Sequence, residues 1–166
     1  MKRFSFLAVI VFLTSCIWRS EPPEYTEYRP VLLQRESLEK SISFHSPEAI
    51  KSPAKIYFKD NYIFVSERFK GVHIIDNSDP KNPVNKGYIN VPGCVDMAIK
   101  QNALYVDNAT DLVVIDLSTL SQAQVKVNKR VRDVFPELST PDGKALPDKY
   151  RVENRPENTV LIGWVK

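Results

Sequence analysis

The sequence predicts an all-β fold, and the strongest sign of it is a stretch of about forty residues that occurs twice. The two copies are related by an offset of 41 that becomes 40 after one deleted residue: Lys59, Asn61, Val65, Ile75, Asp76 and Ser78 recur as Lys100, Asn102, Val106, Ile115, Asp116 and Ser118. Repeats of this length are typical of stacked β-units such as propeller blades, which bury their faces on one another.

The second observation concerns the apolar third strand expected in each copy. Residues 112–115 are all apolar, and residues 72–75 nearly repeat that pattern. In a sheet with one wet face, apolar and polar side chains alternate, so a continuous apolar run predicts sheets that are covered on both faces. A single β-sandwich, or a central strand of a mixed domain, would also explain the run, but it would not explain the repeat.

Turn residues divide the chain into ten expected strands and one short helical turn. Before the repeats, a strand is expected around Val31–Leu33 and a helical turn at 36–41. The remaining strands are expected at 54–58, 62–66, 71–76 and 84–89 in the first copy, at 95–99, 103–106, 112–116 and 124–127 in the second, and at 159–165.

The domain organisation follows from these segments. We expect a signal peptide at 1–15, a lipid anchor and tether at 16–28, a repeat domain at 29–128 with units at about 53–90 and 94–128, and an extension at 129–166 that ends in a strand. Two blades cannot close a ring that typically needs at least four. The fold class is therefore an incomplete propeller of two blades with irregular N- and C-terminal extensions. The chain is then a short variant, an oligomer that shares blades, or the N-terminal piece of a longer product.

The N-terminus has the pattern of a secretory signal. Lys2 and Arg3 precede an apolar run at 4–13, which is about half the ~20 residues needed to span a bilayer. Leu, Thr, Ser and Cys16 follow, and this order resembles the lipobox of bacterial lipoproteins. The resemblance implies cleavage before Cys16, acylation of its thiol and a nearly permanent membrane attachment. Because Ile17 follows instead of the aspartate that retains many lipoproteins at the inner membrane, the outer membrane is expected, facing either the periplasm or the medium.

The repeat itself resembles a known family. Asp111–Asp116 reads DLVVID, Asn61 and Tyr62 lie upstream in the first copy, and residues 77–83 form an Asn-Ser-Asp-Pro-Lys-Asn-Pro turn. These features resemble the LVIVD repeat proteins, which are bacterial lipoproteins and surface proteins regarded as β-propellers. The resemblance covers about residues 29–166 and implies a propeller fold in the cell envelope. It implies no activity and no catalytic residues.

Charge and cysteine content argue against a nucleic-acid partner and against a disulfide-stabilised fold. The formal charge of the chain is +3, and removal of Lys2 and Arg3 with the signal lowers it to +1, so nothing favours nucleic acid as a partner. With Cys16 acylated, Cys94 is left as a single free thiol, so no intrachain disulfide is expected. Stability must then come from packing.

Motifs for metal or cofactor chemistry are missing from the sequence. His45 and His73 lie at no metal-ligand spacing to Cys94 or to a carboxylate pair, and His73 is expected to be a hydrogen-bonded core or blade-interface residue. The glycines form no phosphate loop, and no serine lies in a nucleophile elbow. Five aspartates at strand ends match no calcium loop: Asp76, Asp79, Asp107, Asp111 and Asp116. We therefore predict no metal, no cofactor and no catalytic residue.

The nearest approach to a ligand site is the pair Cys94 and Asp96, where a loop enters the innermost strand of the second unit. Alternatively, they are a small turn residue and an aspartate that accepts backbone N–H bonds. The expected function is a non-catalytic binding or assembly scaffold, which binds a protein partner or itself through an uncovered surface such as that of Val113 and Ile115 or the strand Leu161–Val165. The alternatives are a propeller hydrolase or oxidoreductase, with Cys94, Asp96 or His73 in a central funnel, and a truncated fragment of a longer LVIVD-repeat protein.

Overall fold

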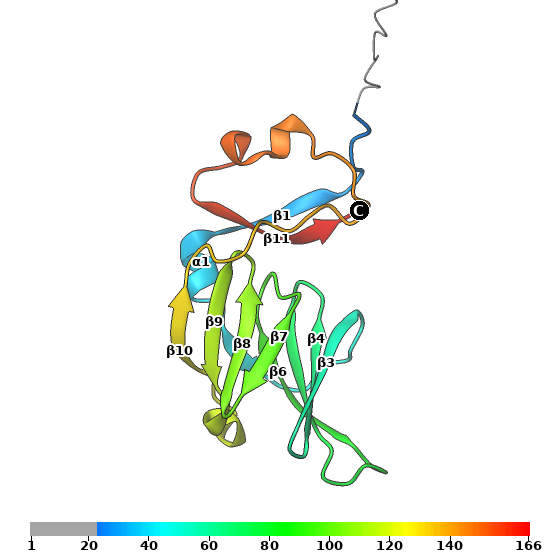
Figure 1. Ribbon diagram of the computed structural model, residues 1–166, viewed down its shortest axis with the longest axis vertical. Coiled ribbons are helices and arrows are strands. Elements are labelled where there is room, and N and C mark those ends of the chain that lie inside the picture. The colour runs from blue at the N-terminus through cyan, green and yellow to red at the C-terminus, as the bar shows by residue number, and fades with distance from the viewer. Residues whose placement is uncertain (1–22) are drawn as a thin grey trace, which may run out of the picture.

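The computed structural model describes residues 23–166, so the predicted signal peptide and the lipidation of Cys16 lie outside the described residues (Figure 1). The elements are β1 (Arg29–Gln34), α1 (Arg35–Glu39), β2 (Ser43–His45), β3 (Pro53–Lys59), β4 (Tyr62–Glu67), β5 (Gly71–Asp76), β6 (Val84–Asn90), β7 (Met97–Lys100), β8 (Ala103–Asn108), β9 (Asp111–Asp116), β10 (Lys126–Val131) and β11 (Thr159–Val165), with 3-10 helices at Leu117–Gln122, Asp148–Tyr150 and Val152–Asn154. None of the helices in the described part of the chain has the length and apolar character needed to cross a membrane.

Each repeat folds into its own antiparallel sheet. Blade 1 has the strand order β2-β6-β5-β4-β3, and blade 2 has the order β10-β9-β8-β7. The equivalent strands β5 and β9 therefore lie in separate sheets, as predicted. All ten expected strands are present, and together they confirm an all-β fold that is an incomplete propeller of two blades.

Two strand boundaries differ from the prediction for local reasons. β7 begins at Met97 instead of Val95, because the backbone N–H groups of Val95 and Asp96 are bound by the Asp107 carboxylate instead of a neighbouring strand. β10 spans Lys126–Val131 and begins two residues later than expected. The reason is that a 3-10 helix at Leu117–Gln122 lies between it and β9. The three-residue strand β2, which adds to the outer edge of blade 1 beside β6, was not predicted.

The extensions that were predicted to be irregular pair with each other. β1 and β11 form a two-stranded antiparallel ladder in which Arg29 lies opposite Val165 and Gln34 opposite Thr159. Figure 1 shows this ladder lying across one end of the two blades. It helps to bury a second, smaller core of Leu38, Ala109 and Val160. The N- and C-terminal segments thus cover that end of the repeat domain together.

The main core lies between the two blades. It contains Phe64, Val72, Ile74 and Ile89 from blade 1, the linker residues Val91 and Cys94, and Met97, Ile99, Leu104, Val106, Val113 and Ile115 from blade 2. Only one face of each sheet is buried in it, so the prediction that both faces are covered is wrong for blade 2. There, Leu112 and Val114 are half-buried, whereas Val113 and Ile115 are fully buried.

This alternation also corrects the prediction of which surface is uncovered. Val113 and Ile115 are not exposed, because they pack against blade 1. Leu161 is buried too, because β11 pairs with β1 and is packed against the end of the blades. The uncovered apolar side chains of blade 2 are those that alternate with Val113 and Ile115.

Candidate functional site

The turn before β7 contains the predicted pair Cys94 and Asp96, and the two side chains have different surroundings. Cys94 is fully buried. Burial raises the pKa of its thiol well above the usual value, and the nearby carboxylate of Asp107 raises it further, so the thiol is protonated at neutral pH. The exposed carboxylate of Asp96 accepts hydrogen bonds from Lys55 Nζ at 2.5 Å and from the Met97 backbone N–H at 2.6 Å. Those bonds lower its pKa.

The Asp107 side chain supports this turn from β8. Its carboxylate accepts the backbone N–H groups of Val95 at 3.0 Å and of Asp96 at 2.8 Å. Burial nevertheless raises the pKa of Asp107 above its ordinary value. The polar groups of the turn thus bind one another, which is the turn chemistry that the sequence left open as an alternative.

A groove of about 470 Å³ lies beside the turn, between β7, β8 and the segment at 135–139. Asp96 lines this groove, whereas Cys94 does not. Most of the wall is apolar and comprises Ala98, Tyr105, Leu112, Phe135 and Leu138. Such a groove suits an apolar side chain better than a charged ligand.

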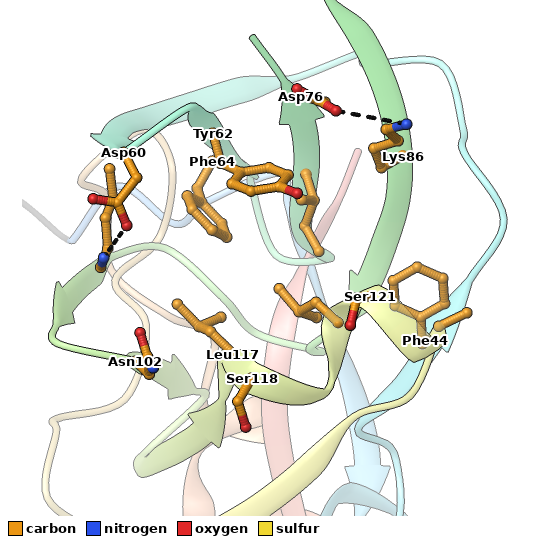
Figure 2. Close-up of a pocket in the computed structure, with 14 residues that line it drawn as sticks. Phe44, Asp60, Tyr62, Phe64, Asp76, Lys86, Asn102, Leu117, Ser118 and Ser121 are labelled. Atoms are coloured by element: carbon orange, nitrogen blue, oxygen red, sulfur yellow. Dashed lines mark hydrogen bonds and ion pairs between the residues drawn. The ribbon is translucent and has the colours of Figure 1, made fainter. Parts of the chain in front are cut away.

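A second cavity, of about 490 Å³, lies between the blades at their opposite end. Figure 2 shows Tyr62 and Phe64 on one side of it and Leu117 and Ser118 on the other. The Asp76 carboxylate at its rim already accepts the backbone N–H and the hydroxyl of Ser78, at 3.0 and 2.6 Å. The other oxygen of this carboxylate, Oδ2, lies 3.6 Å from Lys86 Nζ. Within residues 23–166, no group of three or more His, Cys, Asp or Glu side chains is placed to hold a metal ion.

His73 occupies the interior of blade 1, as expected for a core histidine. It is fully buried, and its Nε2 lies 2.8 Å from Oε2 of the buried Glu67. Lys70 Nζ donates to the other oxygen of Glu67, also at 2.8 Å. Burial on its own would raise the pKa of Glu67, but the bonds from Lys70 and His73 outweigh it and lower the pKa to about 2. The ring of Tyr88 packs on His73 at 4.8 Å between centroids.

Blade 2 contains a second buried charge cluster, at the end near the β1–β11 ladder, and the sequence did not predict it. Asp111 is fully buried, and its two oxygens accept bonds from Arg35 Nη1 and Arg130 Nη1, each at 2.7 Å. Burial would raise the pKa of Asp111, but these guanidinium groups lower it overall. Arg35 also reaches the exposed Asp133 at 3.0 Å. The cluster joins α1, β9 and the start of the C-terminal segment, so its role is to hold these parts together.

The two faces of each blade are related by the repeat. We call the front face the one that carries Tyr57, Phe64, Val72, Ile74 and Ile89 in blade 1 and Ala98, Tyr105, Leu112, Val114 and Val131 in blade 2. We call the back face the one that carries Ile56, Phe58, Ile63, Val65 and Ile75 in blade 1 and Met97, Ile99, Leu104, Val106 and Ile115 in blade 2. Inside the molecule, the front face of blade 1 packs on the back face of blade 2.

The back face of blade 1 and the front face of blade 2 have no neighbouring blade. The back face of blade 1 is nevertheless buried at Val65, His73 and Tyr88, where residues 46–52 cross it between β2 and β3. Only its β3 edge is open, where Ile56 is 67% exposed and Phe58 is 62% exposed.

On the front face of blade 2, Ala98 and Val131 are exposed, and Leu112 and Val114 are half-buried. The sequence reasoning did not place the open β3 edge of blade 1 or the half-buried front face of blade 2. The alternation along β3 and β9 could have located them once the packed faces were known.

A chain with this fold is a repeat protein of the propeller type. Comparison with protein families identifies its repeats as LVIVD repeats, at residues 54–91 and 94–128. The two matches cover β3 to β6 of blade 1 and most of blade 2, which confirms the LVIVD resemblance for these residues. Comparisons with curated proteins and with solved structures find no match.

Proposed function

We propose that this LVIVD-repeat protein is a lipid-anchored protein of the cell envelope, held at the outer membrane by Cys16, whose two blades act as a non-catalytic scaffold for binding or assembly. The observation that carries the proposal is the open apolar edge of blade 1, where Ile56 and Phe58 are exposed side by side on β3. Contiguous apolar surface of this kind typically marks an interaction site in a soluble domain.

The chain just before β1 is fixed to the C-terminal extension. The Thr26 backbone N–H donates to the Ala145 carbonyl at 2.9 Å, and Lys144 Nζ pairs with Glu24 at 2.6 Å. In the proposed arrangement, a lipid on Cys16 would therefore hold the domain to the membrane through the side that carries residues 24–26 and 144–145.

The surroundings of the reactive side chains favour binding over catalysis. A thiol nucleophile must be deprotonated and reachable, whereas Cys94 is buried and its pKa is raised. A general base must reach its substrate, whereas His73 is fully buried and its Nε2 is engaged by Glu67. These observations support the scaffold over a hydrolase or oxidoreductase with a funnel at Cys94 and Asp96.

The anchor is tested with Cys16→Ser in the full chain. We expect the wild type to partition into the detergent phase and to sediment with outer-membrane fractions, and the variant to lose both properties and its globomycin-sensitive processing. A variant that is processed and partitions like the wild type would refute the lipid anchor.

The scaffold is tested by chemical cross-linking in isolated cell envelopes. Phe58→Asp should remove the main cross-linked species, because it places a charge on the open β3 edge of blade 1. Val152→Asp is the matched control, since Val152 is also exposed, at 65%, but lies in the C-terminal extension. If both variants cross-link like the wild type, the open edge of blade 1 binds nothing in the envelope and the scaffold proposal fails.

A further inference from the structure

We propose that the cavity between the blades, at the end away from the β1–β11 ladder, is a binding site for a short, uncharged saccharide. The proposal goes beyond the scaffold function, because it concerns a small ligand and makes no use of the open edge of blade 1. It rests on an apolar inner wall beside an aromatic ring, on hydrogen-bonding side chains without partners, and on charges that are already paired.

The cavity has a preformed apolar inner wall. It holds about 490 Å³ and lies where the front face of blade 1 meets the 3-10 helix that follows β9. The inner wall consists of side chains that belong to the main core or pack against it: Phe64, Ile74, Leu117 and Leu120. Because the core fixes these side chains, the wall is in place before a ligand binds. The volume lies in the range of about 300 to 1,000 Å³ that is usual for small-molecule sites.

Tyr62 adds an aromatic surface to this wall. It is 41% exposed, and its ring lies 6.4 Å from that of the buried Phe64 between centroids. Figure 2 shows both rings on one side of the cavity. The C–H face of a sugar ring is apolar and packs on an aromatic ring, whereas the sugar hydroxyl groups lie around its edge. Tyr62 provides such a surface together with a polar hydroxyl at its tip.

Several hydrogen-bonding groups of the lining have no partner in the protein. Among the hydrogen bonds within residues 23–166, none involves the side chain of Tyr62, Asn102 or Ser121. In Figure 2, Asn102 and Ser121 lie on either side of Leu117. Amide and hydroxyl groups both donate and accept hydrogen bonds. The lining therefore offers donors and acceptors from several directions, which suits a ring that carries hydroxyl groups around its edge.

The charged side chains of the lining are balanced. Lys59 pairs with Asp60. Asp76 binds Ser78 and lies 3.6 Å from Lys86. The lining thus contains two lysines and two aspartates, and its net charge is zero. An ionic ligand would have to separate one of these pairs, whereas sugar hydroxyl groups can bond to both members of a pair. This balance favours an uncharged ligand over a phosphate, a carboxylate or an amine.

The fold of a blade does not require the aromatic ring of Tyr62. At the offset of 41, its equivalent in blade 2 is Ala103. The two residues have the same place in the sheet, since Tyr62 lies opposite Asp76 and Ala103 lies opposite Asp116. Alanine is thus compatible with the strand at this position, and Tyr62→Ala removes the ring without a change in the blade pattern.

The test is a saturation-transfer NMR titration of the full chain, purified in a detergent without a sugar headgroup. The probes are glucose, N-acetylglucosamine and their β-1,4-linked disaccharides. We expect at least one of them to give a saturable signal with the wild type, and Tyr62→Ala to weaken that binding by about tenfold or more. Circular dichroism checks that the variant folds, and Tyr62→Leu, which also lacks the ring, replaces it if it does not.

Two control variants should bind the saccharide like the wild type. Tyr25→Ala removes a tyrosine of similar exposure, 47%, outside the cavity. Phe58→Asp, which tests the scaffold, also lies outside the lining, so the two proposals can fail separately. The inference is overturned if none of these saccharides gives a saturable signal or if Tyr62→Ala binds as well as the wild type. Tighter binding of glucose 6-phosphate or adenosine would overturn it too, because the site would then select a charged or a flat aromatic ligand.

Discussion

The two blades share a sequence pattern but not the same surroundings. Ile56 in blade 1 and Met97 in blade 2 are repeat equivalents on the back face, yet the first is 67% exposed and the second 2% exposed. The pattern determines which face a side chain is on, whereas the place of the blade in the row determines whether that face has a neighbour. Since a row of two blades has two ends, each blade has one face without a neighbouring blade.

The blades also differ in how they bury charge at the end near the β1–β11 ladder. Blade 1 buries Glu67 with His73 and Lys70, whereas blade 2 has Asn108 at the position of Glu67 and buries Asp111 with two arginines. In both blades, a segment outside the repeats completes the cluster: the Lys51 backbone N–H in blade 1 and Arg35 in blade 2. The two carboxylates are not repeat equivalents, so each blade forms its own cluster, and a segment outside the repeats completes it.

The largest effect is expected from Asp111→Ala. The substitution leaves Arg35 and Arg130 without their shared carboxylate in a buried site, and breaking a buried pair in this way costs about 3 to 5 kcal/mol. Urea unfolding followed by circular dichroism measures the loss.

Asp133→Ala is the matched control, because Asp133 also binds Arg35 but is 70% exposed. Its loss should cost at most about 1 kcal/mol. Equal effects of the two substitutions would mean that the cluster at Asp111 does not hold α1 to blade 2.

Truncation at equivalent positions compares the two blades directly. Met97→Ala should destabilise the chain by about 2 to 5 kcal/mol, because it opens a cavity in the main core. Ile56→Ala, on the open β3 edge, should change the free energy of unfolding by about 0.5 kcal/mol or less. Both are measured at a concentration at which the chain is monomeric. Similar losses would show that the β3 edge of blade 1 is also covered within the single chain.

The strands could be predicted because their signals are local. Apolar runs and turn residues define β3 to β6 and β8 to β9 to within a residue or two, and the repeat assigns them to two sheets. The sequence could not show which face of each sheet is packed, because residues 112–115 are all apolar and place apolar side chains on both faces of the sheet. That choice depends on a neighbouring blade.

Long-range contacts were beyond local reasoning. β1 and β11 are more than a hundred residues apart in the sequence, and neither shows which strand it will pair with. The same holds for Arg35 and Asp111, which are 76 residues apart. Asp96 was noticed because it follows Cys94 at a strand end, but its partner Lys55 became visible only when β3 and β7 were placed side by side.

The cluster in blade 1 predicts a response to acid. Since the pKa of Glu67 in the folded chain is about 2, below its ordinary value of 4.5, its contribution to stability is complete above about pH 4.5 and is lost as the pH falls toward 2. Glu67→Gln should therefore be less stable than the wild type at pH 7 by about 1 to 3 kcal/mol, with a difference that narrows below pH 4.5. Thermal unfolding of the wild type and the variant from pH 7 to pH 3 measures this difference in stability.

Glu36→Gln, at an exposed ion pair, is the control, and its difference from the wild type should not narrow at low pH. A constant difference across that range would exclude the charge of Glu67 as the cause.

The smallest effect is expected at the ion pair that joins the blades, Lys55 and Asp96. Both side chains are well exposed, so water and salt screen their attraction, and exposed pairs of this kind contribute about 0 to 1 kcal/mol. A double-mutant cycle of Lys55→Ala and Asp96→Ala, measured by urea unfolding of the monomeric chain, should give a coupling within that range that disappears in 1 M salt. A coupling well above that range, or one that persists in 1 M salt, would mean that solvent does not screen the pair and that it holds the two blades together.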